Sequence, residues 1–142
     1  MIALLQMAPY HLAKTNKNKI EKLKQRAIVF IIPEGPLEGP QNTEIRFPWS
    51  GKITSVIASC VTTGTNDVIL QVETVPLEQF EEESWSVAVE NIVIPAERKL
   101  NNSAFTITNP NLNANDFVRI VVGKAGGGIR DLSIEVLVEL NT

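Results

Sequence analysis

From residue 27 onward, hydrophobicity repeats every second residue, and this period constrains the fold more than any other feature. The segment RDLSIEVLVEL at residues 130–140 shows it most clearly. Successive side chains of a strand point to opposite faces of a sheet, so this segment predicts a strand with one buried face. The residues expected on the buried face are Leu132, Ile134, Val136, Val138 and Leu140.

Seven further segments have strand-like composition, and turn signals rich in Gly, Pro and Asn separate them. Short strands at this spacing are typical of antiparallel sandwiches, and no helical period alternates with them as a parallel α/β sheet would require. We therefore expect an all-β, jelly-roll-like antiparallel sandwich of about eight strands. The expected strands cover residues 27–32, 43–49, 52–62, 67–75, 84–94, 103–108, 116–123 and 130–140.

The preceding segment, LAKTNKNKIEKLKQRA at residues 12–27, has a helical period instead. Ile20, Leu23 and Ala27 recur at spacings of three and four, which predicts a short α-helix with one narrow apolar stripe. Such a stripe packs either against copies of itself or against the following domain. We thus divide the chain into an N-terminal helical segment at 1–26, a candidate trimerisation or docking element, and a β-sandwich domain at 27–142.

Length and charge limit the classes of function. A chain of 142 residues fits one domain with a real core. Residues 14–26 hold six basic residues and one acidic residue, a local charge of +5 that leaves −8 for the rest of a chain of net charge −3. This basic segment has no interleaved aromatic residues, so we expect a solvated helix face and no nucleic-acid partner. No apolar run reaches the length of a membrane span, and MIALLQMA at the start lacks the basic flank of a secretion signal.

The chain offers few groups for catalysis or metal binding. It has one histidine, His11, and one cysteine, Cys60, which lies in an apolar run and is expected to be a small buried side chain. The glycine-rich GKAGGGIRD at 123–131 precedes a strand and not a helix, so it predicts a hairpin and not a phosphate loop. We expect no enzyme, cofactor or metal, and we treat Lys124 and Arg130, which flank the glycines, as candidate partner contacts.

The two tryptophans, Trp49 and Trp85, have two interpretations. On an exposed surface, either one could stack on a sugar ring, which makes a carbohydrate-binding module the alternative function. On alternating strands, Trp49 shares a face with Ile45 and Phe47, and Trp85 shares one with Val87 and Val89, which predicts an inward position. Pro48 has no amide hydrogen, so IRFPWSGKI reads as a corner between two strands.

The order of these motifs resembles a segment of phage and prophage tail-associated proteins. The resemblance rests on TEIRFPWSGKITSVIASCVTTGTNDVILQVETV, NIVIPAERKLNNSAFTI and LNANDFVRIVVGKAGGGIRDLSIEVLVEL, and covers roughly residues 27–140. It implies a non-enzymatic, receptor-binding head-like jelly roll in a virion structural protein. Such a domain is typically a homotrimer that attaches to other virion proteins or to host cell-wall glycan. Its expected location is the virion, or the host-cell cytoplasm before assembly.

Overall fold

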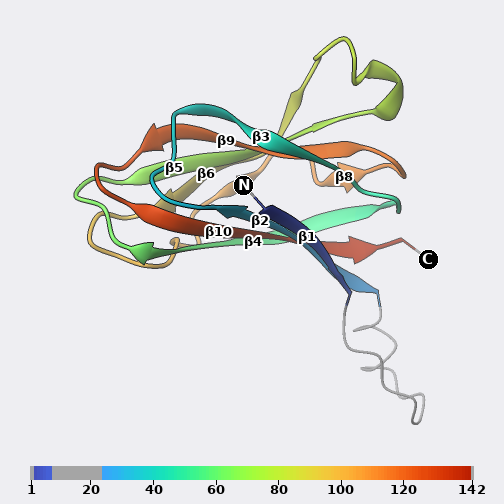
Figure 1. Cartoon of the computed structure of the whole chain (residues 1–142). Helices are drawn as coiled ribbons and strands as arrows, with labels where there is room; N and C mark the ends of the chain where they lie inside the picture. Colours follow the sequence, from blue (N-terminus) through green and yellow to red (C-terminus); the bar gives the residue numbers. More distant parts are fainter. Residues whose placement is uncertain (1, 8–23, 142) are drawn as a thin grey trace, which may run out of the picture.

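The computed structural model describes residues 2–7 and 24–141, and strands dominate both ranges (Figure 1). Eight of the strands correspond to the eight that the sequence pattern predicts, and β1 and β8 are additional. The elements are β1 (Ile2–Met7), β2 (Gln25–Ile32), β3 (Gly39–Arg46), β4 (Gly51–Thr62), β5 (Val68–Val75), the 3-10 helix η1 (Leu77–Gln79), β6 (Ser86–Ile94), β7 (Thr106–Ile107), β8 (Asn111–Leu112), β9 (Phe117–Ala125) and β10 (Arg130–Leu140).

The strands form two five-stranded antiparallel sheets, as expected for a β-sandwich. Sheet A has the order β1-β2-β10-β4-β8, and sheet B has the order β3-β9-β5-β6-β7. The chain changes sheet at each of the connections β2–β3, β3–β4, β4–β5, β7–β8, β8–β9 and β9–β10. Strands distant in sequence therefore lie side by side, as β10 does between β2 and β4.

The core fills the space between the sheets with one face of each long strand. In β10 the alternation is as predicted for Leu132, Ile134, Val136 and Val138, which are at most 1% exposed. Leu140, also predicted to be buried, is only partly buried against the core. The largest side chains at the centre are Phe30 from β2 and Phe47 from the β3–β4 corner, both fully buried. Cys60 is buried at the end of β4, as predicted, and this burial raises the pKa of its thiol.

The N-terminal region departs from the expected helix wherever the structure describes it. Residues 2–7 form β1, which pairs antiparallel with β2 from Ile2–Ile31 to Met7–Arg26. Strand β2 begins at Gln25, so Ala27 lies in a strand and not on a helical stripe. The physical reason is that β2 lies between β1 and β10 and uses its backbone groups in both ladders. Ile20 and Leu23 lie outside the described residues.

The connection from β6 to β8 protects the open edge of β4. The side chain of Asn101 takes the place of a neighbouring strand: its Oδ1 accepts a hydrogen bond from the amide of Ala58 at 2.9 Å, and its Nδ2 donates to the carbonyl of Val56 at 3.2 Å. The amide of Cys60 donates to the carbonyl of Lys99 at 3.0 Å. These bonds satisfy backbone groups of an edge that the two-residue β8 covers only at Gly51 and Lys52.

The corner at residues 47–51 joins the two sheets as predicted. Strand β3 ends at Arg46 and β4 begins at Gly51, so Pro48 interrupts no ladder. Gly51 is needed for a close approach, because a Cβ there would lie 2.6 Å from the carbonyl oxygen of Glu139. The corner is also tied to the loop before β9, since the amide of Phe47 donates to the carbonyl of Asp116 at 2.8 Å.

Candidate functional site

Trp49 lies at this corner and is partly buried against the core. Its ring meets Phe47 edge-on, with centroids 5.6 Å apart. The guanidinium carbon of Arg26, at the start of β2, lies 5.2 Å from the centroid of the indole. An arginine at this distance is a cation–π partner, so the chain itself already supplies a contact to this indole.

Trp85 lies on the outer side of sheet B, where the sequence pattern does not place it. The register of β5 with β6 shifts by one residue between the pairs Val72–Val89 and Glu73–Val87. Ala88 and Val89 are consequently both buried, and the residues before the shift turn outward. The expectation that Trp85, Val87 and Val89 share an inward face is therefore wrong, because an irregularity of one residue reverses the alternation.

On that outer side Trp85 joins a cluster held together by aromatic and polar contacts. The Arg119 guanidinium carbon lies 4.2 Å from the Trp85 ring centroid, and Phe80 meets Trp85 edge-on at 6.1 Å. Phe80 in turn stacks on Phe117 with centroids 3.9 Å apart. The β5–β6 loop, which projects from the sandwich in Figure 1, is thus anchored to the start of β9.

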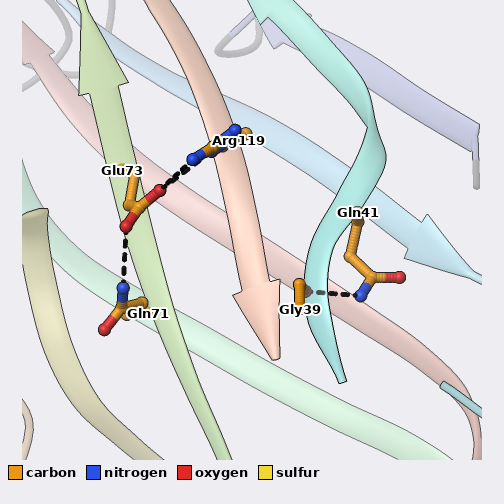
Figure 2. A network of polar contacts seen from close by, with 5 residues as sticks. All are labelled: Gly39, Gln41, Gln71, Glu73 and Arg119. Carbon is orange, nitrogen blue, oxygen red and sulfur yellow. Dashed lines mark hydrogen bonds and ion pairs between the residues drawn. The ribbon is translucent and has the colours of Figure 1, made fainter. Parts of the chain in front are cut away.

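The charge of Arg119 is neutralised within the same face (Figure 2). Its Nη2 and Nε lie 2.7 and 2.8 Å from Oε1 of Glu73, and the Nε2 of Gln71 donates to Oε2 of Glu73 at 2.8 Å. The side chains of Arg119 and Glu73 are only 19% and 13% exposed, so this pair is shielded from solvent more than most surface ion pairs. Around Arg119, the outer face of sheet B therefore satisfies its own charged groups.

The outer face of sheet A has a different character. Five aliphatic side chains lie on it or at its edge, and we call them the sheet A patch: Val29, Ile31, Ile57, Val61 and Leu100. Ile57 and Val61 are 40% and 66% exposed on β4, on either side of Ser59, and Leu100, 57% exposed, pairs with Ser59 from the edge. Ile57, Val61 and Leu100 therefore surround Ser59 and form a continuous apolar surface.

A carboxylate lies in the middle of this patch. Glu135 of β10 is in register with Val29 on one side and with Ile57 on the other. Directly opposed residues of antiparallel strands share a face, so all three lie on the outer side of sheet A. A partner that covered the patch would therefore have to bring both apolar surface and a cation for Glu135.

Lys124 and Arg130 lie at the other end of the sandwich from the tryptophans, on the β9–β10 hairpin that the glycine-rich segment predicts. Both residues are exposed. Lys124 lines an open groove of about 680 Å³ together with Asn66 and Asp67 of the β4–β5 turn. Arg130 does not line this groove, so the structure does not gather the four candidate contacts, Trp49, Trp85, Lys124 and Arg130, into one site.

Within residues 2–7 and 24–141, no group of three or more His, Cys, Asp and Glu side chains could hold a metal ion. In the same residues, no helix is long and apolar enough to span a bilayer. No protein-family model, no curated protein and no solved structure matches this chain.

The sheet A patch is the feature that the sequence reading missed. Its signal is present in KITSVIASCVT, which is apolar on both faces and which predicts a strand covered on both sides. The core covers the inner face through Ile53, Val56 and Ala58, but Ile57 and Val61 stay exposed on the outer face. When a strand has apolar side chains on both faces and the core covers only one of them, the other face indicates an interaction surface.

Proposed function

We propose that this chain is a non-enzymatic structural protein that self-associates through the sheet A patch. The resemblance to phage and prophage tail-associated proteins favours a homotrimer that attaches to a tail component or to a host cell surface. The strand order supports the jelly-roll interpretation, because β2-β10-β4-β8 facing β3-β9-β5-β6 is the pairing that two interlocked Greek keys produce.

The observation that carries this proposal is the exposure of Ile57, Val61 and Leu100 side by side. Burying a fully exposed aliphatic side chain is worth about 1.5–3 kcal/mol. Ile57, Val61 and Leu100 are 40%, 66% and 57% exposed, so a partner that covers them gains about half of that value at each. Sheet B offers no equivalent surface among its described residues, because an ion pair and an aromatic cluster occupy its outer side.

Charge favours a second copy of the chain as the partner. The outer face of β10 carries Glu135 in the middle of the patch, and the body of the chain has a net charge of −8 outside residues 14–26. Residues 14–26 carry +5, so each copy supplies the cations that the patch of another copy requires. We retain Ile20 and Leu23 as further candidates for contacts between copies.

Light scattering coupled to size exclusion tests the proposal on the whole chain. We expect a trimer at tens of micromolar for the natural sequence and a monomer for the double variant Val61→Lys/Leu100→Lys. Leu37→Lys is the matched control, because Leu37 is 80% exposed but lies outside the patch. A monomeric natural chain would contradict the proposal, and so would a double variant that remains trimeric.

A further inference from the structure

A hollow of about 470 Å³ opens at the end of the sandwich where β4, β6 and β9 begin and β5 and β10 end. This end of the two sheets lies on the right in Figure 1. Its volume is in the range of small-ligand sites. The walls come from several separate segments, which only the fold brings together. Its polar lining includes Gln79, Ser86, Asn109, Asn111, Asn113 and Asp116, with Thr74 and Asn141 beside them.

The lining has an unusual chemistry, because amides and hydroxyls outnumber charged groups. Asp116 is the one charged side chain among the described residues that line the hollow, and none of those residues is basic. A site without a cation does not suit a phosphate, a sulfate or an acidic sugar. Carboxamides both donate and accept hydrogen bonds, as the hydroxyl groups of a neutral sugar also do.

We propose that this hollow binds a neutral glycan, and that the asparagine amides and Asp116 form hydrogen bonds with its hydroxyl groups. A carboxylate with one oxygen already bonded within the chain can use its second oxygen to accept a hydrogen bond from a sugar hydroxyl. It is too little charge for a calcium site, which takes six to eight oxygen ligands and usually several carboxylates. The hollow is separate from the sheet A patch, so this proposal does not depend on self-association.

Asp116 is fixed before any ligand arrives. It is 6% exposed, its Oδ2 accepts a hydrogen bond from the amide of Asn113 at 2.9 Å, and its own amide donates to the carbonyl of Asn113 at 3.0 Å. These two bonds close a turn over residues 113–116 and hold the carboxylate in one orientation. A group held in this way loses little conformational entropy when a ligand binds.

The aromatic cluster lies next to three residues of the lining. Gln79, Ser86 and Asp116 are each next in sequence to one of its members: Phe80, Trp85 and Phe117 respectively. The stack of Phe80 on Phe117 therefore sets the position of Gln79 relative to Asp116. In this arrangement Trp85 helps to position the lining residues next to it. The proposed glycan site does not require a sugar ring to stack on the indole of Trp85.

The experiment uses the whole chain on an immobilised array of neutral oligosaccharides built from glucose, galactose, mannose or N-acetylglucosamine, followed by calorimetric titration of the best binder. The test variant is Asn111→Ala/Asn113→Ala, since both residues are exposed at the hollow and, among the described residues, only their backbone groups make hydrogen bonds. The matched control is Asn66→Ala, an exposed asparagine in the groove at the other end. Thermal unfolding verifies that both variants fold.

We expect binding to at least one neutral oligosaccharide, a loss of affinity of about tenfold or more in the double variant, and unchanged affinity in Asn66→Ala. Absence of binding to every neutral glycan on the array would overturn the proposal. Unchanged affinity in the folded double variant would also overturn it, because the hollow would then not be the site. Loss of binding on addition of EDTA would assign the hollow to a cation instead.

Discussion

The two outer faces of the sandwich have the same strand architecture and opposite surface chemistry. On sheet B, Arg119 lies between Glu73 and Trp85 and its charge is matched within the face. On sheet A, Ile57 and Val61 are exposed around Ser59 with no described side chain over them. A face that satisfies its own groups gains little from a partner, whereas a face that leaves apolar side chains in water gains by association.

The contrast separates two kinds of effect. Substitutions on the outer side of sheet B should lower the free energy of unfolding of each molecule and leave association unchanged. Substitutions in the sheet A patch should do the reverse. Substitutions at Phe117, at Glu73 and at Ile57 with Val61 test this division, in order of the expected change in the free energy of unfolding.

The largest expected loss is for Phe117→Ala. Its ring stacks on Phe80 at 3.9 Å, and its removal releases the β5–β6 loop from the start of β9. Because Phe117 is only partly buried, we expect a loss of about 2–3 kcal/mol, below the range for fully buried aromatic residues. Urea unfolding measures this value. A loss below about 0.5 kcal/mol would show that the loop does not depend on the stack.

Glu73→Gln should have the next largest effect, about 1–2 kcal/mol. The substitution keeps the shape of the side chain but leaves the partly buried Arg119 without its anion. A double-mutant cycle with Arg119→Gln isolates the pair, and the control Glu90→Gln changes a carboxylate on β6 for which no salt bridge is found among the described residues. If scattering shows that Glu73→Gln also dissociates the oligomer, the division between the two faces is wrong.

The sequence predicted correctly those strands in which apolar and polar residues alternate regularly along a single segment. In β5 and β10, alternation alone identifies the core positions, such as Val68, Leu70 and Val72, because those strands lie inside their sheets with one face on the core. Strand β8 was not predicted, since two residues carry no period and its pairing depends on the edge of β4. Strand β1 was assigned to the helical segment, because a short, mostly apolar segment such as IALLQM does not by itself distinguish a strand from a helix.

The candidate residues were harder to place than the strands. The corner at Pro48 was predicted correctly, because a proline and a glycine carry conformational information in their own chemistry. The position of Trp85 was wrong, because the register shift near Ala88 depends on the pairing with β5 and leaves no mark in the sequence of β6. The hollow at Asp116 was not predicted, since its walls come from segments that are separated along the chain.

For the sheet A patch, Ile57→Ser/Val61→Ser should change the unfolding of an isolated molecule by less than about 0.5 kcal/mol per site, since both side chains are exposed. The expected effect is on association. The melting temperature of the natural chain should rise with protein concentration, because subunits that bind only the folded state stabilise it. The melting temperature of the variant should not rise. A concentration dependence that persists in the variant would move the contact between copies elsewhere.

Asp116 lies on neither outer face, so its titration tests whether stability and association respond separately. Burial raises the pKa of this carboxyl, with Glu78 adding to the shift and the hydrogen bond from Asn113 opposing it. A carboxyl whose pKa is higher in the folded state holds its proton more tightly there. Its contribution to stability is therefore present at low pH and is lost as the pH rises through the folded pKa.

Asp116→Asn removes this titration and keeps an oxygen that accepts the bond from Asn113. We expect the difference in melting temperature, variant minus natural chain, to increase as the pH rises from below the ordinary aspartate pKa to neutrality. The oligomeric mass should stay constant at each pH, because the side chain is remote from the sheet A patch. A difference that stays flat with pH would show that Asp116 titrates alike in the folded and unfolded chains. A mass that changed with Asp116→Asn would show instead that this end of the sandwich takes part in the contact between copies.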